Sequence, residues 1–294
     1  MPITSTDKLP LEVDMYWDPS CTGGKNPNRK FIKRKRPLVA TVHGASNFAL
    51  PHHYTFQGKK QKIKGHWINF KRKFFWNFFR NNIEGIVTVS DFAKEEIAKE
   101  LRLSKHKILA IHHGYNQEVF HPIDNRKGDY LFHISVFQPV KNIDILLKAY
   151  QQSDPKKRLD LILVIPGYPG RIVIEGVTLI NHPITHEEVA SYMQNARAFF
   201  FPSVRESFGL PLIEAMACGT PVITSRGSAC EEVVADHGIL CDAHQVDDWV
   251  NAIETISTDD ELWSDLSAKS IKRSEDFSWD KSSELHYDFF KSLL

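Results

Sequence analysis

Short, continuous apolar runs alternate with helix-like patterns over most of the chain, and this alternation constrains the fold more than any other feature. In the second half, the runs that read as strands are 130–134, 159–165, 198–201 and 222–224. The helical patterns between them are 143–152, 187–196 and 212–218. A strand that is apolar throughout must be covered on both faces, so the pattern predicts an α/β fold with a parallel sheet between layers of helices.

The first part of the chain shows the same alternation with fewer units. Strand-like runs at 37–42, 85–89 and 107–112 precede a polar, linker-like segment at 122–128. The residues before Pro37 contain only a poor strand candidate, at 15–17. We therefore expect a smaller first domain followed by a more complete second one.

Composition excludes several classes of protein. The formal net charge of +1 gives no general signal for a nucleic-acid partner. No apolar run approaches the roughly 20 residues that span a bilayer, and residues 1–12 have no apolar segment of the kind found in secretory signals. The four cysteines have no C-x-x-C spacing, so we expect buried free thiols in a cytoplasmic protein, and no metal site. They are Cys21, Cys218, Cys230 and Cys241.

The most informative stretch runs from Glu206 to Pro221 and reads as a tight loop that leads into a short helix. Pro211 suits the first helical turn, and Gly209 lets the backbone approach a bound group. The amides of Phe208, Gly209 and Leu210 should then lie beside the positive end of a helix dipole. This geometry predicts a phosphate site.

Two carboxylates, Glu206 and Glu214, flank that phosphate site. A carboxylate beside a phosphate is unfavourable unless neutral hydroxyl groups donate hydrogen bonds to it, as a sugar or a ribose would. The combination therefore favours a nucleotide sugar as the ligand.

These residues belong to a set of segments through which the chain resembles the retaining glycosyltransferases of family 4. The stretch from Glu206 to Pro221 is the specific one, and the resemblance covers roughly 37–294. The other segments are Thr41-Val42-His43-Gly44, Val89-Ser90-Asp91-Phe92, His113-Gly114-Tyr115-Asn116 with Phe120 and Pro122, Pro139-Val140-Lys141-Asn142-Ile143-Asp144, Phe201-Pro202-Ser203, Ser228 with Glu232-Val233-Val234, and Phe277-Ser278-Trp279.

The resemblance implies a GT-B fold, in which two Rossmann-like domains face a cleft. Residues 1–125 would form a shortened, acceptor-side N-terminal domain and 126–277 the domain that binds the nucleotide sugar. Residues 278–294 would form a helix that crosses back to the first domain. The implied reaction transfers a hexose from GDP-mannose or a UDP-hexose to a glycan or lipid-linked glycan in polysaccharide biosynthesis. It would proceed with retention of configuration and without a metal or other cofactor.

The resemblance also implies roles for individual residues. Lys141 would contact the diphosphate, Glu206 the donor sugar and Glu214 the ribose hydroxyls, while His43 would lie across the cleft near the sugar. The expected catalytic residues are thus His43, Lys141 and Glu206. The expected donor-binding residues are Asn142, Gly167, Arg205, Ser207, Phe208, Gly209, Leu210 and Glu214. A solvated lysine, loop carboxylates and a core histidine are the purely structural alternatives.

Two departures from the family pattern leave a second interpretation open. Val136 and Val140 stand where many relatives carry an arginine, so Arg205 is the candidate for the missing cation. The region before Pro37 is also short. A non-catalytic nucleotide-sugar-binding protein, or a subunit whose first domain is completed by another chain, is the alternative function.

Residues 59–80 mix lysines and arginines with tryptophans and phenylalanines. A helix packed into the first domain with a basic outer face would explain the mixture. So would contact with a membrane or a lipid pyrophosphate, in which cations meet anionic headgroups. The sequence leaves open both a packed helix and peripheral contact with the inner face of the membrane, and we expect no nucleic-acid binding.

Overall fold

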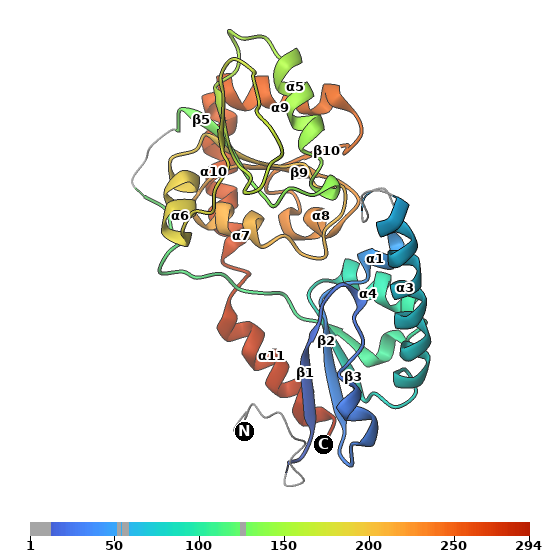
Figure 1. The fold of residues 1–294 in the computed structure, drawn as a ribbon. Helices are drawn as coiled ribbons and strands as arrows, with labels where there is room; N and C mark the ends of the chain where they lie inside the picture. The colour runs from blue at the N-terminus through green and yellow to red at the C-terminus, as the bar shows by residue number, and fades with distance from the viewer. Residues whose placement is uncertain (1–12, 52–53, 55–58, 124–127) are drawn as a thin grey trace. The chain divides into compact units, whose positions relative to one another are not determined.

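The computed structural model describes residues 13–51, 54, 59–123 and 128–294. The chain divides into two compact units (Figure 1). Unit 1 comprises Met1–His112 with Asp280–Leu294, and unit 2 comprises His113–Trp279. The domain boundary expected at 125/126 falls on residues outside the described ranges. Both units consist of a parallel sheet with helices, as the sequence predicts.

Unit 2 contains a six-stranded sheet in the order β10-β9-β8-β5-β6-β7, and all its strand pairs are parallel. The strands are β5 (Tyr130–Ile134), β6 (Asp160–Val164), β7 (Val177–Ile180), β8 (Ala198–Phe201), β9 (Val222–Ser225) and β10 (Ile239–Cys241). The chain builds β5, β6 and β7 outward in one direction and then returns to build β8, β9 and β10 in the other. The reversal lies between β5 and β8, and open α/β sheets bind ligands at this switch point.

Helices cover both faces of this sheet. They are α5 (Ile143–Gln152), α6 (His186–Gln194), α7 (Leu210–Ala217), α8 (Ala229–Val234), α9 (Val246–Thr258) and α10 (Asp260–Ser274). Figure 1 shows α5 and α9 on one side of the sheet and α7 and α8 on the other. The side chains of β8 explain why its sequence is apolar throughout. Phe200 packs on Trp249 of α9, whereas its neighbours Phe199 and Phe201 stack together on the opposite face.

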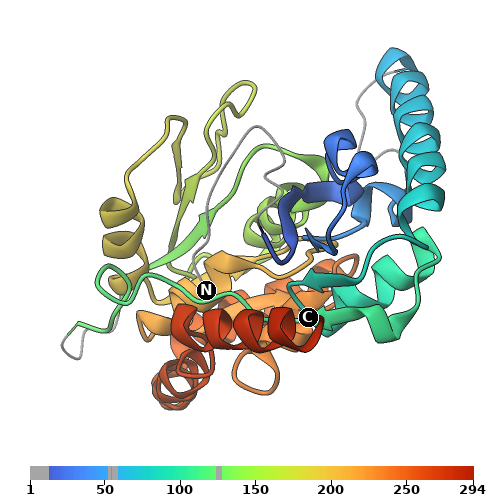
Figure 2. The ribbon, with the colours of Figure 1, turned by 90° about the horizontal axis from the view of Figure 1, so that it is seen from below.

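Unit 1 contains a four-stranded parallel sheet in the order β1-β2-β3-β4. Its strands are β1 (Tyr16–Cys21), β2 (Leu38–Val42), β3 (Gly85–Thr88) and β4 (Ile108–Ala110), and its helices are α1 (Ser46–Ala49), α3 (Lys59–Phe79), α4 (Asp91–Leu101) and α11 (Trp279–Ser292). The helix α11 lies along the sheet (Figures 1 and 2), and its Phe290 packs on Val39, Val87 and Ile111.

The low expectation for a strand near residues 15–17 was wrong, because β1 occupies this region. Tertiary contacts hold this polar strand in the sheet. Trp17 packs on Phe290 of α11, and its ring nitrogen donates to Thr41 Oγ1 at 2.9 Å. The buried Asp18 carboxylate accepts bonds from the amides of Ser20 and Asn28. Partners distant in the sequence thus satisfy groups that make the strand look unfavourable in isolation.

All four cysteines are free and buried, as the sequence predicts. Burial raises the pKa of the Cys218, Cys230 and Cys241 thiols to about 12, because a thiolate loses its solvation in an apolar interior. Among the described residues, no helix is both long and apolar enough to cross a membrane.

Candidate functional site

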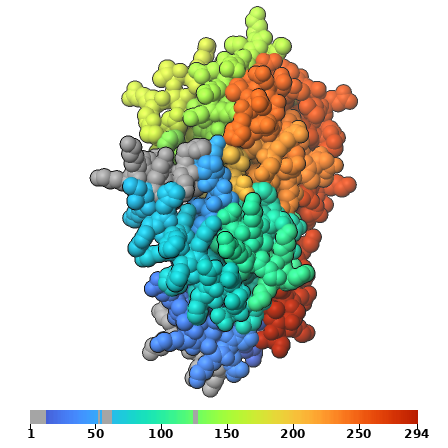
Figure 3. All heavy atoms as spheres, turned by 90° about the vertical axis from the view of Figure 1, so that its right-hand side faces the viewer, coloured from blue at the N-terminus to red at the C-terminus, as the bar shows by residue number. Residues whose placement is uncertain are grey.

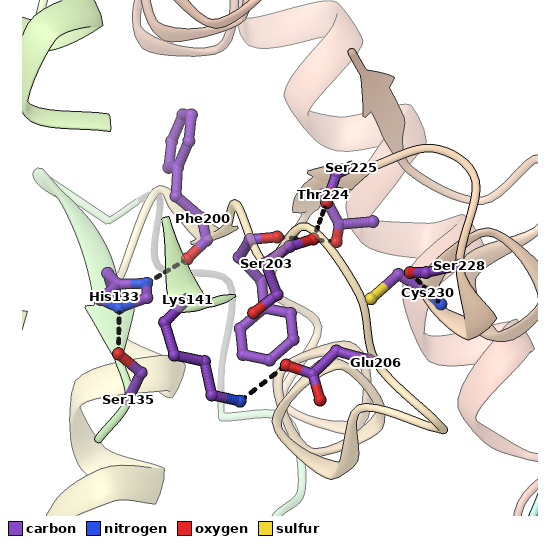
Figure 4. A network of polar contacts seen from close by, with 11 residues as sticks. His133, Ser135, Lys141, Phe200, Ser203, Glu206, Thr224, Ser225, Ser228 and Cys230 are labelled. Carbon is purple, nitrogen blue, oxygen red and sulfur yellow. Dashed lines mark hydrogen bonds and ion pairs between the residues drawn. The ribbon is translucent and has the colours of Figure 1, made fainter. Parts of the chain in front are cut away.

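The candidate site lies at the carboxyl ends of β5 and β8, where the sheet of unit 2 reverses direction. The segment after β5 contains a short 3-10 turn, Pro139–Lys141, and the segment after β8 leads into α7. A backbone hydrogen bond from the Val204 amide to the Val140 carbonyl, 2.9 Å long, joins the two segments. Residues that are far apart in the sequence therefore share one rim (Figure 4).

Lys141 and Glu206 form an ion pair on this rim. The distance between Lys141 Nζ and Glu206 Oε1 is 2.6 Å, and each side chain is only 17% exposed. The ammonium group also lies 5.2 Å from the centre of the Phe201 ring. Partial burial beside an aromatic ring strengthens the electrostatic interactions of both charges, so the pair is a defined charged centre.

The helix α7 begins next to Glu206. Gly209 precedes it in the left-handed conformation, at φ 101° and ψ 60°. The first amides of any α-helix have no carbonyl partner within the helix, and Pro211 has no amide hydrogen to satisfy. The Gly209 and Leu210 amides are therefore placed at the positive end of the helix dipole, as the sequence predicts for an anion site.

Phe208 holds this loop in place rather than lining a ligand site with its ring. Its side chain is buried and packs edge-on against His113 at 5.3 Å and against Phe277 at 5.9 Å. The His113 ring also lies 5.2 Å from that of Trp279. Next to it, a side chain at Gly114 would clash, because its Cβ would lie 2.2 Å from the Trp279 amide nitrogen. The segments around His113 and Phe277 are weak motifs in the sequence, yet they converge on the Glu206 loop.

Glu214 lies one turn further along α7 and is partly buried. Burial raises the pKa of its carboxyl group, and the charge of His186 opposes this shift. A carboxylate with reduced access to water gains most from donors that a ligand brings. Its position is suited to accepting hydrogen bonds from neutral hydroxyl groups.

His133 on β5 is a site residue that sequence reasoning missed. Its ring is fully buried, with Nδ1 2.8 Å from the Phe200 carbonyl oxygen and Nε2 2.8 Å from Ser135 Oγ. A carbonyl oxygen only accepts, so Nδ1 donates and the neutral ring accepts the Ser135 hydroxyl at Nε2. Burial lowers the pKa of His133 to about 4; the bond to Phe200 opposes this shift and the charge of Lys141 adds to it.

This imidazole ties β5 to β8 beneath the rim and fixes the hydroxyl of Ser135. The signal in the sequence was His133 itself, a polar residue in a largely apolar strand, two positions before Ser135.

Further hydroxyl groups line the same rim (Figure 4). Thr224 Oγ1 donates to the Phe201 carbonyl at 2.8 Å, and Ser225 Oγ donates to the Ser203 carbonyl. Ser228 caps α8 by accepting from the Cys230 amide at 3.3 Å. The buried Ser203 Oγ has no hydrogen-bond partner among the described residues. Sequence reasoning assigned none of these hydroxyl groups a role in the site, although Ser203 and Ser228 belong to segments that carry the family resemblance.

The remaining predicted residues differ in where their side chains lie. Asn142 donates from Nδ2 to the Ala243 carbonyl at 2.8 Å, so its side chain fixes a neighbouring loop. Gly167 forms an open left-handed turn after β6, at φ 79°. Arg205 and Ser207 are partly exposed in the loop that carries Glu206. His43 lies in unit 1, where its Nε2 is 3.2 Å from the Pro19 carbonyl oxygen.

Two parallel α/β units, one with a charged centre at its switch point, are consistent with the GT-B class of fold, and solved structures agree. The sucrose-phosphate synthase of Thermosynechococcus elongatus superposes with a TM-score of 0.73 at 23% identity, over 89% of this chain and 69% of that one. The Anabaena Alr3699/HepE protein in complex with UDP-glucose gives a TM-score of 0.71 at 16% identity, over 90% and 74% of the two chains. The chain therefore has the GT-B fold, as expected.

The family follows from the sequence models. The model for glycosyl transferases group 1 matches residues 116–273, and that for glycosyltransferase family 4 matches residues 19–119. The chain belongs to the group 1 glycosyltransferases, which confirms the predicted resemblance.

Individual relatives agree with this assignment. The O-antigen chain mannosyltransferase B of Escherichia coli is 27% identical over 290 residues, which are 91% of this chain and 73% of the relative. An uncharacterised glycosyltransferase of Methanocaldococcus jannaschii is 28% identical over 269 residues, 89% of this chain and 69% of the relative.

Proposed function

We propose that this glycosyltransferase transfers a hexose from a nucleotide diphosphate sugar to a glycan or lipid-linked glycan, with retention of anomeric configuration. The observation that carries the proposal is the Lys141–Glu206 ion pair beside the start of α7. GDP-mannose and UDP-hexoses are the candidate donors. The mannosyltransferase relative supports the first, and the fold neighbour in complex with UDP-glucose supports the second.

The main electrostatic task is to stabilise the diphosphate as the glycosidic bond breaks. Lys141 supplies one positive charge and the start of α7 about half a charge more. A diphosphate carries two negative charges, which is more than these groups neutralise. We propose Arg205, in the loop that carries Glu206, as the further cation. The donor would then attract the Lys141 ammonium group away from an exclusive pairing with Glu206.

The two carboxylates would position the donor through its hydroxyl groups. A carboxylate has about four acceptor positions, so Glu206 can pair with Lys141 and still accept bonds from the sugar. Glu214 would accept bonds from the ribose. No side chain is assigned as a nucleophile; the leaving phosphate itself would accept the acceptor's proton, and His43 would act from unit 1. Independence of metal ions and other cofactors, and a cytoplasmic location, remain predictions.

The purified chain tests this proposal directly. We expect thermal stabilisation by GDP-mannose or a UDP-hexose, because a ligand that binds only the folded state stabilises it. Release of the nucleoside diphosphate should follow, undiminished by EDTA, and proton NMR of the product should show the anomeric configuration of the donor. Absence of binding by every donor would refute the proposal, and inversion would refute its stereochemical part.

A non-catalytic nucleotide-sugar-binding protein, or a subunit that requires a partner chain, remains the second candidate. It is favoured by the sheet of unit 1, which has four strands among the described residues against six in unit 2. Donor binding without hydrolysis or transfer would support this alternative. Transfer by the isolated chain would exclude it.

A further inference from the structure

The helix α3 has two apolar faces, although a surface helix ordinarily has one. Trp76 and Phe79 point into unit 1 and are almost fully buried. A second group of large apolar side chains lies at intervals of three and four residues, so its members share one face of the helix. These residues, here called the α3 stripe, are Ile63, Trp67, Phe70, Phe74 and Phe78. Between 44% and 72% of each of them is exposed.

The buried face of α3 fixes the direction of the stripe. Trp76 Nε1 donates to the Gly24 carbonyl at 3.0 Å, and Arg72 Nη1 donates to the Gly23 carbonyl at 3.1 Å. On the same side, Asn69 Nδ2 donates to the Asn47 carbonyl at 2.7 Å. Rotating α3 to hide the stripe would break these bonds, so the stripe remains on the surface. Figures 1 and 2 both show α3 on the outside of unit 1, and Figure 3 shows the face that it forms with α4.

The charge of α3 has a single sign. Its sequence contains seven cations and no aspartate or glutamate, and the cations are Lys59, Lys60, Lys62, Lys64, Lys71, Arg72 and Lys73. Lys64 and Lys71 are exposed at the edge of the stripe, and Lys71 Nζ lies 3.5 Å from the centre of the Trp67 ring. Positive charge therefore borders the stripe at Lys64 and Lys71, whereas Lys73 pairs with Glu100 of α4 at 3.1 Å.

A hollow of about 300 Å³ opens beside α3, and most of its accessible lining is apolar. Four cations line it, and none of the lining residues is a carboxylate; these cations are Lys25, Arg29, Lys71 and Arg72. The Arg29 guanidinium group lies 4.2 Å from the centre of the Phe75 ring, and both residues line the hollow. Lys25, Arg29 and Lys71 are suitable donors for a phosphate group.

From this juxtaposition we propose that unit 1 docks on an anionic phospholipid bilayer through α3. The stripe enters the interfacial region, Lys64 and Lys71 meet the headgroups, and the cations that line the hollow bind a lipid phosphate. Tryptophan and phenylalanine beside lysine form the composition that binds such interfaces. A second copy of α3 is an unfavourable occupant, because it would place the exposed Lys64 and Lys71 against like charges. Nucleic acid offers no apolar layer for Ile63 and Phe70.

Cosedimentation of the full chain with vesicles tests the docking. We expect binding to vesicles that contain phosphatidylglycerol, weaker binding to pure phosphatidylcholine, and a decrease with added salt. Phe70→Ser combined with Phe74→Ser should weaken binding at least about tenfold, because both rings lose their burial in lipid. Val173→Ser is the matched control, since Val173 is a 91% exposed apolar residue of unit 2.

Two further measurements locate the contact. Brominated lipids should quench part of the tryptophan fluorescence, and that part should disappear in Trp67→Phe. Lys64→Gln with Lys71→Gln should reduce the salt-dependent component of binding. Thermal unfolding and donor binding in solution should match the unaltered chain, because none of these residues belongs to the site in unit 2.

Several outcomes would overturn the docking proposal. One is the absence of binding to anionic vesicles at low salt. The others are equal binding losses in the stripe variants and in Val173→Ser, and no quenching of Trp67 fluorescence by brominated lipids. Oligonucleotide binding that requires the stripe, or a dimer that the stripe variants dissociate, would assign α3 to another partner. The donor experiments are independent of all these outcomes, so the two proposals can fail separately.

Discussion

The ammonium group of Lys141 lies 2.6 Å from Oε1 of Glu206, although 65 positions separate the two residues in the sequence. The strand order explains this contact. β5 and β8 are neighbours in the sheet, so the loops that follow them meet at one rim. The pair places a cation beside the start of α7 and leaves its carboxylate within reach of the same ligand.

Removing the cation should weaken donor binding. We expect Lys141→Ala to lower the affinity for the nucleotide diphosphate sugar at least tenfold, or about 1.4 kcal/mol, because a partly buried carboxylate then faces the diphosphate without its counterion. Calorimetric titration measures the change. Lys148→Ala, which removes an exposed lysine of α5, is the control and should leave the affinity unchanged. In the double variant with Glu206→Gln, the losses should not add, because the two groups interact directly.

Arg205 should supply further compensation for the diphosphate. Arg205→Ala is expected to weaken donor binding at least tenfold, about 1.4 kcal/mol, whereas Arg205→Lys retains the charge and should retain most of the affinity. Titrations of the two variants with the same donor provide the comparison. Unchanged affinity in the alanine variant would show that Lys141 and the amides of α7 suffice.

His133 should make folding stability dependent on pH in the acidic range. In the unfolded chain a histidine binds a proton below its usual pKa of about 6.5, whereas burial keeps folded His133 neutral to about pH 4. The contribution of His133 to the free energy of unfolding is therefore fully present above pH 6.5. It is lost progressively as the pH falls toward 4, by up to roughly 3 kcal/mol. Denaturant unfolding from pH 7 to pH 4 measures this loss.

His133→Gln is the matched variant for this experiment. Its amide can donate to the Phe200 carbonyl and accept from Ser135, but it does not titrate. The variant should lose less stability on acidification than the unaltered chain. Parallel pH profiles for the two proteins would show that His133 does not cause the acid sensitivity.

Gly209 should be required for the loop before α7. Gly209→Ala places a side chain at φ 101°, which costs roughly 1–2 kcal/mol for the left-handed backbone alone. Its Cβ would also lie 2.9 Å from Leu212 Cδ1. Gly170→Ala is a close control, because Gly170 has a φ of 100° and no atom lies within 4 Å of its would-be Cβ. Unfolding and donor titration should show the larger loss at Gly209, and equal losses would contradict this prediction.

The sequence predicted the fold best where the burial of a segment can be inferred from the residues of that segment alone. The strand predicted at 130–134 coincides with β5, because an apolar run flanked by polar residues can be buried in only a few ways. The start of α7 was predicted from Gly209 and Pro211 for a similar local reason. In contrast, β1 was only a poor strand candidate in the sequence, because Trp17 and Asp18 find their partners Thr41 and Asn28 outside the strand.

The candidate site was predictable as a set of residue types but not as a geometry. The Glu206 loop and Lys141 could be identified, yet their ion pair depends on the order of strands in the sheet. The bond between His133 and Ser135 was missed, because a buried histidine has no periodic signature. Which aromatic residues of α3 are buried and which are exposed could be seen only in the fold, since the two groups are chemically alike in the sequence.

The sequence by itself determined the alternation of strands and helices, the glycine turn that starts α7 and the family of the chain. These features depend on neighbours within a few residues, whose backbone preferences and burial are local. Only the tertiary structure decided that Lys141 meets Glu206, that His133 fixes Ser135, and that Trp76 is buried while Trp67 is exposed. Such contacts join residues far apart in the chain, and the packing of the whole unit selects them.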